Sequence, residues 1–174
     1  MKILLVGGSG FLGAWVAHFL NINQCLARIF DPNKPDSEWH RLSGISTDAT
    51  EWVAGNVSRK SDLDDAIRDC QGVINLAGLL TPECSQNPFR GAKVNLIGPI
   101  NVFEGALKHG LKKVAYTSSI GVYGPDHAEF PEPTTHYGSF KLASEGVARA
   151  FYEEHGISSL GVRPFVVYGP GREI

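Results

Sequence analysis

The sequence lacks the marks of several protein classes. It has three cysteines among 174 residues, Cys25, Cys70 and Cys84, and no C-x-x-C pair, so we predict neither a disulfide framework nor a zinc site. The six histidines show no metal-ligand spacing. No block of lysine or arginine stands out at a net charge of −2, which argues against nucleic acid and anionic membranes as partners. The N-terminal apolar run ends after five residues, so we expect no signal peptide, no membrane span and a reducing cytoplasmic location.

The first thirteen residues carry the strongest positive signal. Lys2–Val6 has the length of a buried strand, and the glycine-rich segment 7–13 (Gly-Gly-Ser-Gly-Phe-Leu-Gly) follows it directly. Apolar residues at spacings of three and four then predict an amphipathic helix from Phe11 to Leu20. A strand, a glycine turn and a helix in that order predict a phosphate cradle. Glycine lets a pyrophosphate approach the backbone amides, and the helix N-terminus carries partial positive charge.

The glycines are spaced Gly7-x-x-Gly10-x-x-Gly13, which alone would also fit a glycine-rich turn in an unrelated α/β protein. Asp31 ends the next predicted strand, at the place where a carboxylate accepts hydrogen bonds from the adenosine ribose of a dinucleotide. Because a carboxylate repels a 2′-phosphate, we predict NAD rather than NADP. The alternative is that Asp31 is an ordinary turn residue before Pro32.

The rest of the chain alternates between the two periodicities. Strands are predicted over residues 26–30, 51–55, 73–78, 113–117 and 157–162, and helices over 61–70, 89–109 and 137–154, with a short helix around 37–42. This order predicts an α/β fold of the Rossmann type, a doubly wound parallel sheet in three αβα layers, formed as a single domain over residues 1–174. Residues 79–88 are expected to form a loop at the ligand-binding edge of the sheet.

Two asparagines have open interpretations. Asn56 follows the third strand, where its amide could bind the adenine ring or could stabilise a turn. Asn95 lies four residues before Pro99, inside the helix predicted over residues 89–109. Proline removes the helical hydrogen bond to the Asn95 carbonyl, so we hypothesise that this carbonyl holds a water near the active site. The alternative is a packing kink without chemistry.

The chemistry is predicted from Tyr137 and Lys141, which lie one helical turn apart on one face. A neighbouring ammonium and a positive nicotinamide ring would lower the phenol pKa, so that Tyr137 takes a hydroxyl proton as hydride leaves. Lys141 would also hold the nicotinamide ribose, and Ser119, after the fifth strand, would polarise the substrate oxygen. The alternative is an exposed helical pair that has no catalytic role.

Taken together, these pieces resemble the extended short-chain dehydrogenase/reductases, also called the NAD-dependent epimerase/dehydratase family. The matching pieces are Gly7-x-x-Gly10-x-x-Gly13, Asp31, Gly55-Asn56-Val57, Asn75-Leu76-Ala77-Gly78, Asn95-x-x-Gly98, Ser118-Ser119-x-x-Val122-Tyr123-Gly124, Tyr137-x-x-x-Lys141 and Arg163-Pro164-x-x-Val167-Tyr168-Gly169-Pro170-Gly171. The resemblance implies that Ser119, Tyr137 and Lys141 are catalytic, with Asn95 beside them. It implies cofactor contacts from Gly7, Ser9, Gly10, Phe11, Leu12, Gly13, Asp31, Asn56, Val57, Leu76, Ala77, Gly78, Tyr137, Lys141, Pro164 and Val166.

The resemblance implies hydride transfer between NAD and a carbinol of a sugar or nucleotide-sugar, as in epimerases and dehydratases. A net dehydrogenase or reductase of a sugar acid, steroid or other alcohol stays open, and so does a dinucleotide-binding module or fragment without turnover. Family members usually continue far beyond the Tyr-Gly-Pro-Gly motif, so we expect the C-terminal substrate domain to be missing from this sequence. The family also implies a homodimer, through helices whose outer faces we expect to carry Ile97, Val102, Phe103, Ala148 and Phe151.

Overall fold

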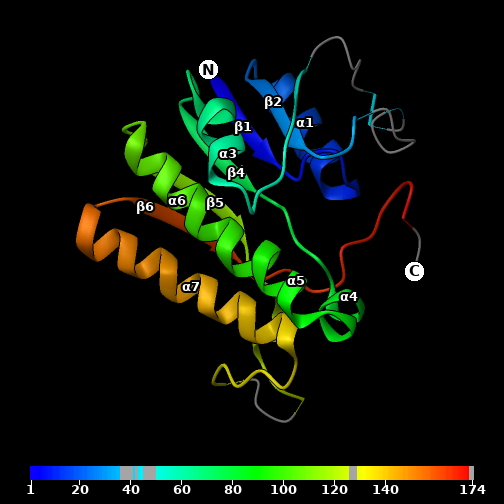
Figure 1. The fold of residues 1–174 in the computed structure, drawn as a ribbon. Helices are drawn as coiled ribbons and strands as arrows, with labels where there is room; N and C mark the ends of the chain where they lie inside the picture. The colour runs from blue at the N-terminus through cyan, green and yellow to red at the C-terminus, as the bar shows by residue number, and fades with distance from the viewer. Residues whose placement is uncertain (36–40, 42, 45–49, 126–128, 173–174) are drawn as a thin grey trace.

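The structure is a computed structural model that describes residues 1–35, 41, 43–44, 50–125 and 129–172. The short helix predicted around residues 37–42 lies largely outside the described residues. The described chain forms a six-stranded sheet, and every pairing between neighbouring strands is parallel (Figure 1). The strand order is β3-β2-β1-β4-β5-β6. The strands are β1 (Lys2–Val6), β2 (Leu26–Asp31), β3 (Glu51–Ala54), β4 (Gly72–Asn75), β5 (Lys113–Thr117) and β6 (Ser158–Val162).

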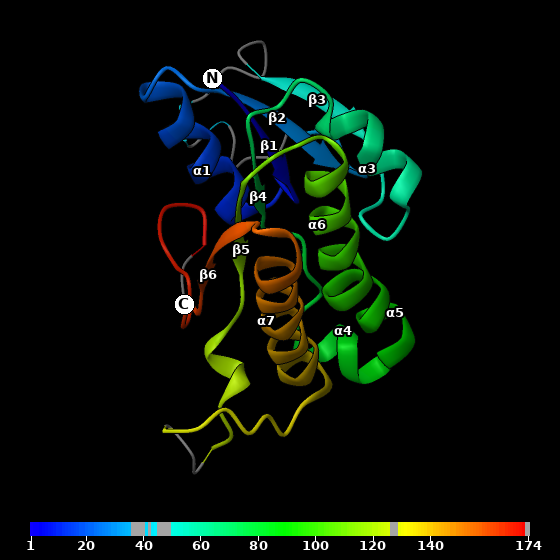
Figure 2. The ribbon, with the colours of Figure 1, turned by 90° about the vertical axis from the view of Figure 1, so that its left-hand side faces the viewer.

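Helices cover both faces of the sheet, which confirms the predicted three-layer α/β fold. Figure 2 shows α1 on one side of the sheet and α3, α6 and α7 on the other. The helices are α1 (Phe11–Ile22), α3 (Lys60–Ile67), α4 (Thr81–Gln86), α5 (Pro88–Ala92), the π-helical η2 (Lys93–Ile97), α6 (Gly98–Lys108), the 3₁₀ turn η3 (Ile120–Val122) and α7 (His136–His155). The change of face between α1 and α3 is the doubly wound arrangement that places a ligand site at the carboxyl edge of the sheet.

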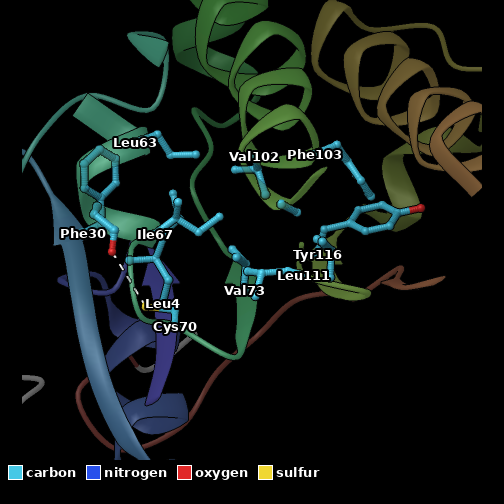
Figure 3. Packing of buried hydrophobic residues seen from close by; sticks show 14 of the residues in the cluster. Leu4, Phe30, Leu63, Ile67, Cys70, Val73, Val102, Phe103, Leu111 and Tyr116 are labelled. Carbon is cyan, nitrogen blue, oxygen red and sulfur yellow. Dashed lines mark hydrogen bonds between the residues drawn. The ribbon is translucent and has the colours of Figure 1, made fainter. Parts of the chain in front are cut away.

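The larger core lies between the sheet and the layer of α3, α6 and α7 (Figure 3). Leu63 and Ile67 of α3 are fully buried there, and Phe103 of α6 stacks on Phe151 of α7 with ring centroids 5.2 Å apart. Phe103 also meets Tyr116 of β5 edge-on at 6.1 Å. A smaller cluster, which includes Leu5 and Ile29, packs beneath α1. Burial of apolar side chains on both faces explains why residues 3–6 of β1 form a continuous apolar run rather than an alternating one.

Strand register decides which segments meet at the carboxyl edge. Val6 pairs with Phe30 on one side and with Asn75 on the other, so the residues after β1, β2 and β4 emerge side by side. Thr117 pairs with Val162, which places the residues after β5 beside those after β6. The predicted site segments are therefore brought to a single edge of the sheet by backbone pairing alone.

Two expectations about the segment after β4 need correction. The loop predicted over residues 79–88 contains α4, in which Pro82 stands in the first turn, where proline costs no helical hydrogen bond. The helix predicted over residues 89–109 is three consecutive helical segments, α5, η2 and α6. The π-helical η2 ends directly before Gly98-Pro99, so the chain accommodates the proline by widening the preceding turn.

The faces expected to form a dimer are mostly turned inward. Val102, Phe103 and Ala148 are at most 2% exposed and lie in the core under α6 and α7. Phe151 is partly buried against the same core, while Ile97 is 41% exposed. The assignment of the first three side chains to an outer face is wrong, because the helical periodicity identified the apolar side but not its direction.

Candidate functional site

The three glycines of the first loop occupy different environments. A Cβ on Gly7, which has a φ of +76°, would stand 2.6 Å from the Ala77 amide nitrogen, and a Cβ on Gly13 would stand 2.5 Å from the Gly8 carbonyl oxygen. Gly10 is different, because the nearest atom to its imagined Cβ is the Gly7 carbonyl oxygen at 3.7 Å. Gly7 and Gly13 therefore allow close packing, while the space beside Gly10 stays open for a ligand.

A cleft of about 970 Å³ opens above this loop at the carboxyl edge of the sheet. Eleven of the predicted cofactor residues line it: Gly7, Gly10, Phe11, Leu12, Gly13, Asp31, Asn56, Val57, Leu76, Ala77 and Gly78. Four cationic side chains, Arg59, Arg90, Lys93 and Arg172, and the acid Glu83 also line it. The volume lies in the range of sites that hold a cofactor-sized molecule.

Asp31 is held at the end of β2 by the glycine loop and by its own turn. Its Oδ2 accepts a hydrogen bond from the Ser9 amide at 3.3 Å, and its Oδ1 accepts one from the Asn33 amide at 2.9 Å. The Ser9 hydroxyl in turn donates to the Asn33 carbonyl at 2.7 Å. The carboxylate is therefore oriented at the rim of the cleft, where an oxygen with remaining lone pairs can accept from a ribose hydroxyl.

Asn56 stabilises a turn, as one of its two interpretations proposed. Its Oδ1 accepts from the Ser58 amide at 3.0 Å and from the Ser58 hydroxyl at 2.9 Å. The backbone amide nitrogen of Asn56 donates to Asp62 Oδ2 at 3.1 Å. Asn56 still lines the cleft, so its side-chain amide nitrogen remains a candidate partner for a base.

The side chain of Asn95 holds the loop after β4 in place through hydrogen bonds. The Asn95 side chain is fully buried, and it hydrogen-bonds to both backbone groups of Leu79. Asn95 Oδ1 accepts from the Leu79 N–H at 3.0 Å, and Asn95 Nδ2 donates to the Leu79 C=O at 2.9 Å. Asn95 also donates to Cys84 Sγ at 3.1 Å, while the Cys84 thiol donates to the Leu79 carbonyl at 3.3 Å. Burial raises the pKa of the Cys84 thiol and keeps it protonated. The observed role of Asn95 therefore runs through its side chain, whereas the hypothesis named its carbonyl.

Lys141 packs against Gly78, a residue of the cleft lining. Its side chain is buried, and its Nζ donates to the Thr117 carbonyl at 2.8 Å. A Cβ placed on Gly78 would lie 3.4 Å from Lys141 Nζ and 3.1 Å from Asn95 Oδ1, so the glycine keeps the ammonium next to the cleft lining. Burial lowers the pKa of Lys141 to about 8, because the charged form loses its hydration.

Tyr137 and Ser119 form the second part of the predicted catalytic group. The Ser119 hydroxyl hydrogen-bonds to the Tyr137 phenol, and its Oγ accepts from the Gly121 amide at 3.0 Å. Lys141 Nζ lies 5.8 Å from the Tyr137 ring centroid. Burial nevertheless raises the pKa of Tyr137, and this effect exceeds the lowering by Ser119. The predicted lowering depends on a positive nicotinamide ring as well as on Lys141, so it stays a prediction for the cofactor-bound site.

The segment after β6 is fixed beside Ser119 by a charged network that the sequence analysis missed. Arg163 donates to both carboxylate oxygens of Glu145, at 2.8 and 2.6 Å, and also to the Tyr123 hydroxyl. The Ser118 hydroxyl donates to the same Glu145 carboxylate, and the pKa of Glu145 is lowered mainly by Arg163. The network anchors the end of β6 to α7, since an arginine fork matches a carboxylate well.

Pro164 and Val166 are the predicted cofactor residues with the least support from geometry. The Pro164 carbonyl accepts from the Ile120 amide at 3.0 Å, which places it beside the turn after Ser119. Val166 is 53% exposed. The described lining of the cleft includes neither residue, and it also omits Ser9, Tyr137 and Lys141. The structure thus brings Ser119, Tyr137 and Lys141 together without showing Val166 beside them.

The described residues contain neither a membrane-spanning helix nor a cluster suited to a metal ion. None of their helices is both long and apolar enough to cross a membrane. No group of three or more histidine, cysteine or acidic side chains within them is arranged to hold a metal ion.

The residues present fit a dinucleotide. The open space at Gly10 and the N-terminus of α1 suit a pyrophosphate, Asp31 suits a ribose, and the absence of a side chain at Gly78 lets Lys141 approach the cleft lining. Sequence reasoning missed Cys84 and Arg172, which lie close to these features. Neither belongs to a recognisable motif, and only the folded chain shows where they lie.

Comparison with known proteins gives the family. A model of the NAD dependent epimerase/dehydratase family matches residues 3–173. The chain is 32% identical over 163 residues to the bifunctional UDP-glucose 4-epimerase and UDP-xylose 4-epimerase 1 of Pisum sativum, covering 85% of this chain and 47% of that protein. It is 29% identical to the decarboxylating sterol-4-alpha-carboxylate 3-dehydrogenase of Saccharomyces cerevisiae, covering 98% of this chain and 52% of that protein.

Among solved structures, the fold is similar to the Thermus thermophilus UDP-glucose 4-epimerase in complex with NAD. The TM-score is 0.82 at 21% identity, over 94% of this chain and 54% of that one. The chain thus spans about half the length of the curated relatives it matches. The match to the family model over nearly every residue shows that this chain belongs to the NAD-dependent epimerase/dehydratase family.

Proposed function

We propose that this chain is the NAD-binding part of an oxidoreductase of the epimerase/dehydratase type, with hydride passing between NAD and a carbinol of a sugar or nucleotide-sugar. One observation carries the proposal. Gly78 lines the glycine cleft, Lys141 Nζ lies 3.4 Å from the position of a Cβ added to Gly78, and Lys141 shares its helix with Tyr137. A dinucleotide lying along the cleft would therefore bring its far end to the proposed catalytic group.

The residues divide the chemistry among them. NAD supplies the hydride-accepting ring when it is bound. Ser119 donates a hydrogen bond to the substrate oxygen, and Tyr137 takes the hydroxyl proton at its phenolate oxygen. Lys141 would hold the nicotinamide ribose, and the positive nicotinamide ring would favour the phenolate. Asn95 is a positioning residue, because it fixes the backbone of Leu79, which lines the cleft.

The substrate class rests on the relatives, two of which are named as epimerases of UDP-sugars. The yeast relative is named as a sterol dehydrogenase and is 29% identical, so a net dehydrogenase acting on another alcohol is the second candidate. The same Ser119, Tyr137 and Lys141 would serve both reactions. A dinucleotide-binding module without turnover is the third candidate, because the chain covers about half of its relatives.

The first test is calorimetric titration of NAD and NADP into the 174-residue chain and its Asp31→Ala variant. We expect the unaltered chain to bind NAD more tightly than NADP, because the Asp31 carboxylate accepts from ribose and repels a 2′-phosphate. Asp31→Ala should reduce that preference by about tenfold or more, which corresponds to ~1.4 kcal/mol. Asp65→Ala, which removes an exposed carboxylate on α3, serves as the matched control and should keep the preference.

Binding of neither nucleotide would count against the chain as a working cofactor domain. Equal preference before and after Asp31→Ala would remove Asp31 from the site but leave the cleft. Thermal unfolding of each variant separates these outcomes from loss of the fold, since Asp31 also accepts a hydrogen bond from the Ser9 amide.

The cellular setting and assembly are further parts of the proposal. A cytoplasmic location is supported by the three cysteines, all of which are free. The homodimer stays a prediction from the family, and Ile97 on η2 is the one named outer residue that is largely exposed.

A further inference from the structure

A short turn near the C-terminal end of the described chain folds back onto the glycine loop. The Arg172 amide donates to the Gly169 carbonyl at 2.8 Å, and the Gly169 amide donates to the Arg172 carbonyl at 3.1 Å. Pro170 and Gly171 occupy the middle of this turn, and Gly171 has a φ of +90°. Proline followed by a glycine of positive φ is typical of a type II turn, so this sequence preorganises the position of Arg172.

The turn lies against the first residue of α1. The position of an added Cβ on Gly169 is 3.6 Å from Phe11 Cζ, and the Arg172 guanidinium carbon lies 5.9 Å from the centroid of the Phe11 ring. In Figure 2 the red C-terminal segment runs beside α1. Arg172 is exposed and lines the dinucleotide cleft, so its charge is available to a bound molecule.

The glycine loop itself offers no cationic side chain. Residues 7–13 are Gly-Gly-Ser-Gly-Phe-Leu-Gly, and α1 carries no basic residue in its last turn and no acid in its first. The N-terminus of α1 can therefore hold a phosphate only through backbone amides and the helix dipole. A pyrophosphate bears two negative charges, and a nearby arginine can bind phosphate oxygens with two parallel hydrogen bonds.

The four cations of the cleft lie in three different places. Arg59 belongs to the segment before α3, and Arg90 and Lys93 belong to the run from α5 to η2. Arg172 lies against α1 itself. Arg172 therefore contacts Phe11, the residue that directly follows Gly10 and its open space.

We propose that Arg172 is a pyrophosphate-binding residue, and that the turn Gly169–Arg172 is a strap which places its guanidinium over the phosphates at the N-terminus of α1. This inference rests on the proposed function, since it takes the cleft to hold a dinucleotide. It adds a side-chain anion contact to a site otherwise built from backbone groups, and it gives the Pro170-Gly171 pair a role in binding.

The test uses the 174-residue chain with three ligands: NAD, ADP and adenosine. Arg172→Gln should weaken NAD and ADP by about tenfold, because one charge-assisted contact to phosphate is lost. Adenosine has no phosphate, so its affinity, measured by NMR chemical-shift titration, should change by less than about twofold. Arg172→Lys should lose less than Arg172→Gln, since it keeps the charge but not the planar fork.

Two further variants separate a specific contact from a general effect. Gly171→Ala keeps Arg172 but disfavours the positive φ of the turn, so it should weaken ADP in the same direction. Arg149→Ala removes an exposed arginine from α7, away from the cleft lining, and should leave all three affinities unchanged.

The outcomes distinguish this inference from the proposed function. A wild-type chain that binds neither NAD nor ADP overturns both. Wild-type binding with an unchanged ADP affinity in Arg172→Gln overturns the role of Arg172 alone. Equal weakening of ADP and adenosine would also overturn it, because Arg172 would then act only by supporting Phe11.

Discussion

The glycine segment Gly7–Gly13 and the group of Ser119, Tyr137 and Lys141 lie at the same edge of the sheet but are built from different materials. The first is made of backbone: glycines that permit close approach, free amides at a helix end, and one open space at Gly10. The second is made of side chains whose ionisable groups are buried, with the pKa of Tyr137 raised and that of Lys141 lowered to about 8.

The glycine segment is the binding half of the site, and the group of Ser119, Tyr137 and Lys141 is the chemical half. Their properties come from different sources. The glycine segment is placed once the strands pair in register, because the donors within it are backbone groups. In the chemical half, burial favours the neutral forms of both Tyr137 and Lys141, which opposes the phenolate that proton abstraction requires. A cation arriving with a ligand would shift Tyr137 toward the phenolate, so this half depends on what the first half binds.

The largest expected effect comes from making two alanine variants within one loop. Gly13→Ala should destabilise the fold by about 3 kcal/mol, because its Cβ would stand 2.5 Å from the Gly8 carbonyl oxygen and neither backbone segment can move freely. Gly10→Ala meets nothing closer than 3.7 Å, so its stability should change by less than about 1 kcal/mol. Urea unfolding of both variants measures the contrast.

For NAD binding to folded protein, Gly10→Ala should be the more damaging of the two variants. Gly10→Ala fills the space proposed for the pyrophosphate and should reduce NAD affinity by at least about tenfold. If Gly10→Ala bound NAD as tightly as the wild type, the open space at Gly10 would not be the phosphate site.

Protonation of Lys141 provides the next largest effect. Its pKa falls to about 8 in the folded chain, against an ordinary value of 10.5, so the unfolded chain binds more protons between those two pH values. Stability from this group should therefore rise as pH increases from about 8 to 10.5, by about 3 kcal/mol in total. The measurement is the free energy of unfolding across this range for the wild type and for Lys141→Met.

The subtraction isolates the lysine from other titrating groups. The pKa values of Cys70 and Tyr116 are raised by burial, and these groups lower stability at high pH in both proteins. Cys84 interacts with Lys141, so its change belongs to the difference between the two proteins. The wild-type free energy minus that of Lys141→Met should climb with pH. A flat difference would mean that the Lys141 ammonium keeps its hydration in the folded state.

Periodicity and motif spacing predicted the fold and most of the cleft, because both follow from local patterns and strand register. The apolar runs at residues 2–6 and 26–30 identify strands, and register then places Gly7 beside Asp31. The inward direction of Val102, Phe103 and Ala148 was missed, since periodicity shows an apolar face without showing what covers it. Contacts between distant segments, such as Arg172 on Phe11, have no local signal at all.

The pKa of Tyr137 in the chain without a cofactor could not be predicted for a related reason. The spacing of Tyr137 and Lys141 correctly placed them on one helical face, 5.8 Å apart from ring centroid to Nζ. Sequence spacing could not reveal that Nζ would donate to the Thr117 carbonyl, or that burial would outweigh the Ser119 hydrogen bond. Burial and tertiary partners decide an ionisation state, and neither can be read from four residues of helix.

The smallest of the expected effects concerns the joint between the two halves, where Asn95 holds Leu79. Asn95→Ala should destabilise the chain by about 2 kcal/mol, because the Leu79 N–H and C=O lose their side-chain partners in a partly buried place. Cys84→Ser should cost less, about 1 kcal/mol, since a hydroxyl can still donate to the Leu79 carbonyl.

Amide hydrogen exchange at Leu79 reports the joint directly, and it should accelerate in Asn95→Ala far more than in Cys84→Ser. The matched control is Asn87→Ala, which removes the exposed side-chain cap of α5, and it should leave exchange at Leu79 unchanged. Slow exchange at Leu79 in Asn95→Ala would show that the loop is held by its own backbone, and Asn95 would then have no positioning role at the border of the cleft.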